Sequence, residues 1–339
     1  MKKQTAFALV LVSAAVLGPP HAQAQVIPYG TIDNAVEYQD GGAGSVTRAV
    51  SSGLYATVYG FKGSEDLGNG TRVNFQLEQG FSGVTGAATD PAAAFNRLAW
   101  IGVSGNFGEF RLGRQKKPEY LFLNNEMDPS GVKSIASPLG NFSDDSVRSS
   151  NAIAYFTPTL HGFTGQFMVA LREEAARPTL VSYNAAVRYV NGLFRAVAGY
   201  ERTGKAGSFL EQRVFRAAAS YAVGTVRYYL AYQTERKNDG SEKRDIYAVS
   251  AAWRATPANQ LSLMYGHAYD RTDGADHAQQ VGLLYEHFLS RRTTLYSAAG
   301  LIRNRNEAQF SLDGTQYSGV PGAPGAHARG INLGIACKF

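Results

Sequence analysis

Two sets of charged residues have types and spacing that could act together electrostatically. The segment from Pro118 to Val147 contains one basic residue, Lys133, and five acidic residues, Glu119, Glu126, Asp128, Asp144 and Asp145. Three arginines lie in or beside short alternating runs around this segment, Arg72, Arg97 and Arg148. Carboxylates that face guanidinium groups across a narrow water-filled gap create a transverse field, which orients ions and dipolar molecules. Such chemistry involves no covalent step.

Motifs for covalent chemistry do not occur in the sequence. There is no G-x-S-x-G, no H-E-x-x-H and no G-x-x-x-x-G-K-[ST]. The six histidines are scattered and Cys337 is the single cysteine, so no metal-ligand set is apparent. We therefore expect no enzymatic activity, no metal, no cofactor and no nucleic-acid partner.

Strands with period-two alternation must position these charges. In residues 71–78, TRVNFQLE, Arg72 lies on the polar face opposite Phe75. By the same alternation Arg97 lies opposite Leu98. Further runs of this kind occupy residues 162–172, 224–233 and 244–254. In the last run Ile246 is an exception, because it falls on the polar face.

The number and spacing of these runs predict one large barrel. About sixteen segments of roughly 9–11 residues can be placed, and their connectors alternate between short and long. The long ones include residues 80–94, 116–147 and 304–328. We predict an all-β fold, a 16-stranded antiparallel transmembrane β-barrel with short periplasmic turns and long outer loops. A secreted β-sandwich needs fewer strands, and a propeller would show a blade repeat.

The N-terminus predicts export. Lys2 and Lys3 precede a short apolar core, and Ala22 and Ala24 occupy the small-residue positions of a signal-peptidase site. We expect a signal peptide over 1–24 and a mature barrel over 25–339, whose formal charge falls from +6 to +4 without the two lysines. With one cysteine, no intramolecular disulfide can form.

The C-terminus fits the same fold. Residues 331–339, INLGIACKF, alternate strictly and end on Phe339. In a bilayer every backbone group needs a partner within the protein, so this strand should close against residues 28–38, PYGTIDNAVEY. Its apolar face should meet outer-membrane lipid, with Phe339 at the interface. A terminal aromatic after alternating apolar residues also resembles the assembly signal that the barrel assembly machinery recognises.

Several stretches resemble Gram-negative general porins. They are YGTIDNAVEY, YGFKGSEDLGNGTRVNFQLEQGF, NRLAWIGVSGNFGEFRLGRQ, NAIAYFTP and the terminal Phe339. The resemblance is dense over 29–158 and returns at the C-terminus. It implies an outer-membrane homotrimer of sixteen-stranded barrels that passes small hydrophilic solutes and ions by passive diffusion.

The resemblance also implies a constriction. In such porins the third outer loop folds into the lumen and places acids opposite wall arginines; here that loop would be residues 117–147. Arg97 and Arg148 match wall-arginine positions, whereas Val58 stands where relatives carry another arginine, with Lys62 and Arg48 as possible substitutes. The net charge of +4 and the lumen arginines favour anions, and the acidic loop and Val58 nearly offset them, so we expect only a weak preference for anions. The simpler reading of the loop is a solvated acidic outer loop.

Two other functions remain open. A substrate-specific channel should carry an aromatic track along the lumen, and most Tyr and Phe residues here fall on the outward face. A structural or adhesion barrel would act through its outer loops, and eight strands would suffice for it.

Overall fold

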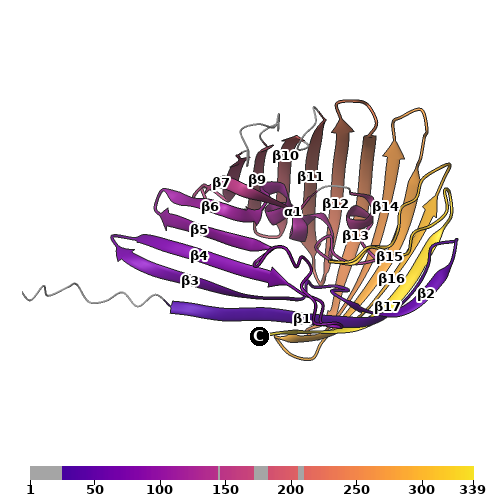
Figure 1. Ribbon diagram of the computed structural model, residues 1–339, viewed down its shortest axis with the longest axis horizontal. Helices are drawn as coiled ribbons and strands as arrows, with labels where there is room; N and C mark the ends of the chain where they lie inside the picture. The colour runs from indigo at the N-terminus through magenta and orange to yellow at the C-terminus, as the bar shows by residue number, and fades with distance from the viewer. Residues whose placement is uncertain (1–24, 144–145, 172–181, 205–209) are drawn as a thin grey trace, which may run out of the picture.

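The computed structural model describes residues 25–143, 146–171, 182–204 and 210–339, and these form an almost entirely β structure (Figure 1). The first strands are β1 (Gln25–Asp40), β2 (Ser45–Ser51), β3 (Val58–Gly68), β4 (Thr71–Gly80), β5 (Leu98–Gly105) and β6 (Gly108–Lys116). Two short helices follow, α1 (Pro118–Met127) and α2 (Pro138–Phe142). The predicted signal peptide, 1–24, lies outside the described residues.

The remaining strands cover the second half of the chain. They are β7 (Arg148–Phe156), β8 (Phe163–Ala170), β9 (Ser182–Asn191), β10 (Phe194–Gly204), β11 (Glu211–Val223), β12 (Val226–Lys237), β13 (Lys243–Thr256), β14 (Asn259–Asp270), β15 (Ala278–Phe288), β16 (Thr293–Asn304) and β17 (Ala328–Lys338). Most of them begin within a few residues of the positions that the alternation predicts.

The sheet closes on itself as an antiparallel barrel. Sequential strands pair in turn, and β17 pairs with β1 over Thr31–Asp40. The other edge of β1 pairs with β3 through residues 25–31 and with β2 through residues 34–40. β2 and β3 are therefore two halves of one barrel strand, and the predicted 16-stranded barrel is confirmed.

The break between β2 and β3 has a specific cause. Asp33, fully buried on the inner side of β1, accepts hydrogen bonds from the backbone nitrogens of Leu54 (2.9 Å) and Tyr55 (2.5 Å). The Tyr55 hydroxyl then reaches Glu286 of β15 at 3.0 Å. Residues 52–57 thus leave the wall and enter the lumen.

The two ends of the barrel differ in their connectors. Short turns such as 69–70, 106–107 and 192–193 lie at one end, and the longer connectors 81–97, 117–147 and 305–327 begin at the other. At the first turn Gly68, Asn69 and Gly70 all have positive φ, which glycine and asparagine tolerate. Short turns mark the periplasmic end of an outer-membrane barrel, so the long connectors lie outside the cell.

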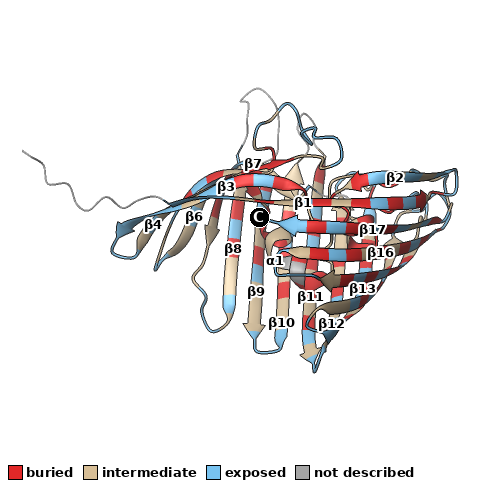
Figure 2. Cartoon of the chain, turned by 90° about the horizontal axis from the view of Figure 1, so that it is seen from below, coloured by how far each residue is buried: buried red, intermediate tan, exposed pale blue. Residues whose placement is uncertain are grey.

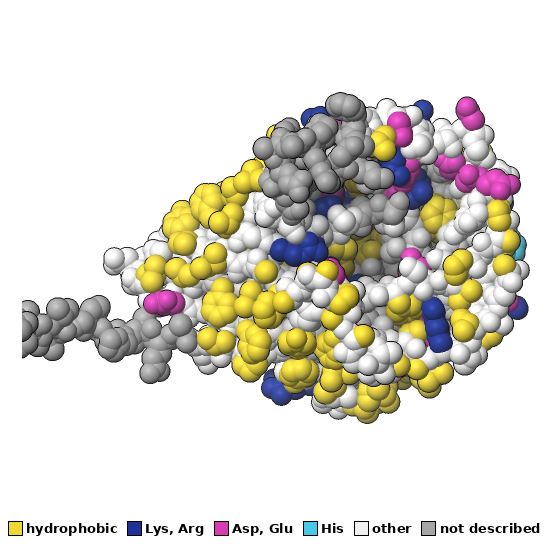
Figure 3. Space-filling model, in the orientation of Figure 1, with side chains coloured by type: hydrophobic (Ala, Val, Ile, Leu, Met, Phe, Trp, Pro, Cys, Tyr) yellow, Lys and Arg dark blue, Asp and Glu magenta, His cyan; other side chains and the backbone are white. Residues whose placement is uncertain are grey.

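Burial alternates along the strands, as bands in Figure 2 show. The outward side chains are apolar and exposed, for example Leu230 (62%) and Leu333 (68%). Apolar side chains also cover the visible face of β3–β6 in Figure 3. No helix in the described parts of the chain is long and apolar enough to cross a membrane.

Candidate functional site: a charged constriction in the lumen

The connector 117–147 is folded into the barrel. α1 contacts β9–β12 and α2 contacts β13–β15 (Figure 1). Glycines on these strands make room for the loop: a Cβ at Gly282 would lie 1.8 Å from the carbonyl oxygen of Ala136, and one at Gly266 would lie 2.3 Å from Cβ of Pro138. The loop backbone therefore lies directly on the wall.

An apolar core forms beneath this loop. Ile135, Leu139 and Phe142 are fully buried and belong to one cluster with inward wall residues such as Ile246 and Leu284. The alternation predicts a polar inner face. The structure differs, because apolar wall residues lie on that face beneath the loop. Ile246 falls on the inward face because it packs in this core.

The last connector, 305–327, also turns inward. Leu312 is buried in the same core, and the amide of Gln39 donates a 2.7 Å hydrogen bond to its carbonyl oxygen. The backbone nitrogen of Asp313 donates to Oδ1 of Asn141 at 2.9 Å. This connector is therefore a second loop in the lumen.

Three segments meet at one point. The Thr315 hydroxyl donates to the carbonyl oxygens of Lys133 (2.7 Å) and Leu54 (3.2 Å). Residues 52–57, the 117–147 loop and the 305–327 loop are joined there. Beside them is a cavity of about 420 Å³, lined by Tyr120, Lys133 and Tyr317 among others.

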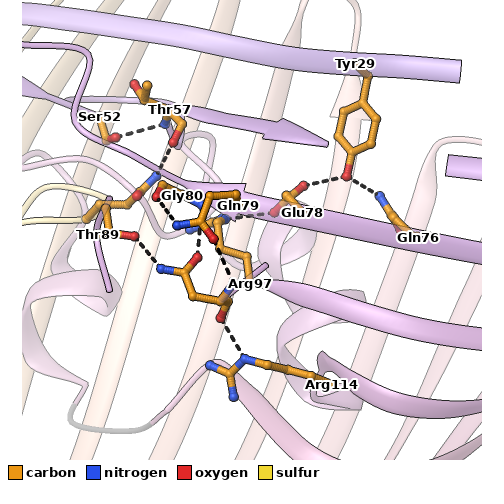
Figure 4. Close-up of polar contacts among 12 residues, drawn as sticks. Tyr29, Ser52, Thr57, Gln76, Glu78, Gln79, Gly80, Thr89, Arg97 and Arg114 are labelled. Carbon is orange, nitrogen blue, oxygen red and sulfur yellow. Dashed lines mark hydrogen bonds and ion pairs between the residues drawn. The ribbon is translucent and has the colours of Figure 1, made fainter. Parts of the chain in front are cut away.

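Basic side chains gather on the opposite wall. Lys116 and Arg148 are cross-strand partners in β6 and β7, and Arg97 stands just before β5. Arg97 Nε donates to Oε1 of Glu78 at 2.8 Å, and Glu78 also accepts a hydrogen bond from the Tyr29 hydroxyl (Figure 4). Arg97 and Arg148, two of the predicted arginines, lie close enough to interact electrostatically.

Lys133 joins this basic group from the loop. Burial lowers the pKa of its ammonium, and the positive charges of Arg97, Lys338 and Arg148 lower it further, whereas Asp128 raises it. Positive charge thus converges on the loop from several wall positions.

Two of the predicted loop acids are buried, Glu126 against the wall and Asp128 within the loop itself. Glu126, 2% exposed, lies 3.4 Å from Arg195 and 3.7 Å from Arg188. Asp128 accepts hydrogen bonds from the backbone nitrogens of Ser130 (2.8 Å) and Val132 (3.1 Å). Both carboxylates hold the loop in place.

Glu119 is the most constrained of these acids. It is 1% exposed and lies 3.8 Å from Arg216. Burial raises the pKa of Glu119 well above its usual range, and the Glu201 carboxylate raises it further, although Arg216 and Lys117 act in the opposite direction. Asp144 and Asp145 lie outside the described residues.

The other predicted positions lie elsewhere. Arg72 is exposed at the turn end of β4, 3.6 Å from Asp66, and the structure does not bring it together with Arg97 and Arg148. Arg48 belongs to β2 and pairs with Glu37 at 3.0 Å, whereas Lys62 lies over the ring of Tyr29. Val58 is the first residue of β3, next to the break in the second barrel strand.

Phe339 lies at the seam of the barrel. Its backbone nitrogen donates to the Gly30 carbonyl oxygen at 3.0 Å, and Gly30 donates back at 3.1 Å. The exposed ring covers the position that a Gly30 side chain would occupy. The last residue thus adds a rung between β17 and β1.

Sequence reasoning missed the inward 305–327 loop, the 52–57 segment and Lys116. The glycines Gly282 and Gly300 on inward positions were a readable signal, because a strand glycine marks a close backbone approach. Asp33 on the inner face of β1 was a weaker one.

A closed barrel with short turns, long loops and two of those loops folded into its lumen is typical of an outer-membrane channel. The family model described as Gram-negative porin matches residues 7–307, and the chain belongs to that family. It is 31% identical to outer membrane porin protein 32 of Delftia acidovorans, over 99% of this chain and 100% of that protein. It is 30% identical to major outer membrane protein P.IB of Neisseria meningitidis, covering 86% and 92%.

Solved structures agree with this membership. An anion-selective porin from Comamonas acidovorans superposes with a TM-score of 0.82 at 27% identity, covering 94% of this chain and all of that one. The trimer form of OmpT from Vibrio cholerae, 12% identical, shares the fold with a TM-score of 0.71 over 93% and 99%. The chain is thus a porin of the outer membrane, and the prediction that it is a channel and not an enzyme is confirmed.

Proposed function

We propose that the chain is a general diffusion channel for small hydrophilic solutes, with a constriction that prefers small anions. The observation that carries this proposal is the asymmetry of the constriction. Arg97, Lys116, Lys133 and Arg148 come together and stay partly exposed, whereas Glu119, Glu126 and Asp128 are nearly fully buried. Buried, paired acids offset little of the potential in the opening.

The relatives support the anion preference. One solved structure of similar fold at 27% identity is titled an anion-selective porin. A positive constriction raises the local anion concentration and lowers that of cations, most strongly in dilute salt. Selectivity here is passive, since pore width and potential decide which solutes pass.

We test this with reversal potentials in a KCl gradient across a planar bilayer. The double variant Arg97→Glu with Arg148→Glu should shift the reversal potential in the direction of cation selectivity. The double variant Asp144→Asn with Asp145→Asn should shift it in the direction of anion selectivity. Arg72→Glu, at the exposed turn end, is the matched control and should shift it much less. Unchanged potentials in the Arg97/Arg148 variant at low salt would remove these residues from the constriction.

A channel specific for one solute would behave differently. Its flux would saturate at low solute concentration, and that solute would block ion current. General diffusion predicts flux that rises linearly with concentration and falls with solute size. Liposome-swelling rates for sugars and organic acids of increasing size distinguish the two.

The same proposal includes assembly and export. A homotrimer is supported by the shared fold with the trimer form of OmpT. We also propose that the signal peptide is cleaved after Ala24 and that the barrel assembly machinery recognises Phe339. N-terminal sequencing of the purified protein and crosslinking in membranes test cleavage and trimer formation.

A further inference from the structure

A second cavity lies on the inner wall of the barrel, between the constriction and the short turns. It has a volume of about 490 Å³, and none of its lining residues lines the cavity beside the constriction loop. Strands β1 and β3–β6 supply the lining, which includes Ile27, Lys62, Gln76, Trp100, Glu109 and Arg111. We call it the turn-side cavity, because Glu109 follows the turn 106–107 almost directly.

The turn-side cavity faces the lumen and not the lipid. Lys62 of β3, Gln76 of β4 and Trp100 of β5 are successive cross-strand partners, so their side chains share one face of the sheet. The Gln76 amide donates a 2.7 Å hydrogen bond to the Tyr29 hydroxyl, which donates to Glu78 at 3.0 Å (Figure 4). Glu78 is the partner of the constriction arginine described above. A solute in the lumen therefore has access to this cavity.

The charged groups of the cavity leave one cation in surplus. Arg111 lies between two rings, with its guanidinium carbon 4.0 Å from the centroid of Trp100 and 4.2 Å from that of Phe156. The same guanidinium pairs with Glu109 at 2.7 Å. Lys62 is exposed, and within the described residues no carboxylate oxygen lies within 4.0 Å of its ammonium. Lys62 is therefore available to an anion.

An apolar surface stands beside this free cation. Ile27 is the cross-strand partner of Lys62 and keeps 41% of its surface exposed on the lumen side. The Lys62 ammonium lies over the ring of Tyr29, 5.5 Å from its centroid. Burial of the exposed apolar area under a bound solute would be favourable. One positive charge next to an apolar surface suits an anion with a hydrocarbon body.

Other classes of solute fit this cavity less well. A neutral sugar would stack on an exposed aromatic face, but Trp100 is only 9% exposed and lies under Arg111. A cation would meet the surplus positive charge, because Glu109 is already paired. An inorganic anion would leave Ile27 in contact with water.

We propose that the turn-side cavity is a second solute site, which weakly binds small monocarboxylates with an apolar body. The carboxylate lies against the Lys62 ammonium in a charge-assisted hydrogen bond, and the hydrocarbon part covers Ile27 and the ring of Tyr29. This inference rests on the proposed diffusion function only in that the solute reaches the cavity through the lumen.

The test measures binding of cyclohexanecarboxylate to the detergent-solubilised mature protein by tryptophan fluorescence. The chain has two tryptophans, so Trp253→Phe removes the one that is 50% exposed on β13 and leaves Trp100 as the reporter in the cavity. Acetate lacks the apolar body and cyclohexylmethanol lacks the charge, which makes them the matched ligands. The assay needs no conduction, so a silent channel and an empty cavity are separate results.

Three variants are compared in this background. Lys62→Gln removes the free charge and Lys62→Arg keeps it. The matched control is Arg72→Gln, which removes an exposed positive charge at the turn end of β4, 3.6 Å from Asp66.

In dilute salt the background protein and Arg72→Gln should bind cyclohexanecarboxylate about 10-fold more tightly than either matched ligand. Lys62→Gln should bind it no better than cyclohexylmethanol, and Lys62→Arg should keep most of the preference, which separates loss of charge from misfolding. Equal binding by Lys62→Gln and the background protein would overturn the proposal, as would Trp100 emission that does not respond to cyclohexanecarboxylate. Acetate that binds as tightly as cyclohexanecarboxylate would also overturn it, in favour of a simple anion site.

Discussion

The hydroxyl of Thr315 donates a 2.7 Å hydrogen bond to the carbonyl oxygen of Lys133, and this contact joins the last outer loop to the constriction loop. Because the same hydroxyl also reaches Leu54, one side chain links three lumen segments. Two loops and the 52–57 segment therefore meet inside the barrel.

Thr315→Val should loosen this junction. The variant removes the one hydroxyl proton that the carbonyl oxygens of Lys133 and Leu54 share, which costs about 1–3 kcal/mol if the site stays dry. We expect a lower thermal midpoint and noisier, larger single-channel currents. Thr159→Val, at an exposed periplasmic turn, is the control. Currents of unchanged size and noise would show that the last loop does not limit conduction.

Gly282→Leu should displace the constriction loop. The new side chain would occupy the place of the Ala136 carbonyl, so the loop must move off the wall. We expect increased conductance and a stability loss of about 1–3 kcal/mol. Gly44→Leu is the control, since no atom lies within 4 Å of its Cβ position. A Gly282 variant with wild-type conductance would contradict the position of the loop.

The pH dependence of selectivity should reveal Lys133. Its lowered pKa means that it loses charge below the usual lysine range near 10.4, so anion preference should decline as the pH rises towards that range. The unfolded chain holds this proton over the same interval, so the Lys133 contribution to stability increases with pH there. Lys133→Arg should keep its anion preference throughout. Coinciding profiles of wild type and Lys133→Arg would exclude this role.

Deletion of Phe339 should impair assembly more than stability. The exposed ring and one backbone rung account for at most about 1.5–3 kcal/mol. We expect strongly reduced surface levels, with refolding in detergent nearly intact. Phe339→Tyr should restore the levels, since it keeps a terminal aromatic. Normal surface levels of the deletion would remove the signal role.

The strands were predictable because lipid on one side and water on the other impose period two. That pattern located most strand starts, and it also marked Ile246 as unusual. The packing that explains Ile246 was not predictable, since it depends on Ile135 and Leu139 of a loop more than 100 residues earlier.

The charged site was predictable only in part. The family resemblance assigned Arg97 and Arg148 to the wall, and they lie together. The alternation was wrong for Arg97, because it placed Leu98 on the lipid face. Leu98 is buried on the inner side of β5, whereas Ile101 and Val103 are exposed on the outer side. Whether a loop acid faces the pore or the wall depends on partners such as Arg195 on distant strands, which the sequence does not place. The inward turn of 305–327 depends in the same way on Asn141 and Gln39.

Single-channel recording of the purified mature protein in a planar bilayer tests the central claim most directly. A water-filled barrel with a basic constriction should give stable open steps, grouped in threes for a trimer, with chloride more permeant than potassium in dilute salt. Folded, β-rich protein that leaves the bilayer silent in repeated reconstitutions would contradict the channel, and steps that favour potassium would contradict the basic constriction.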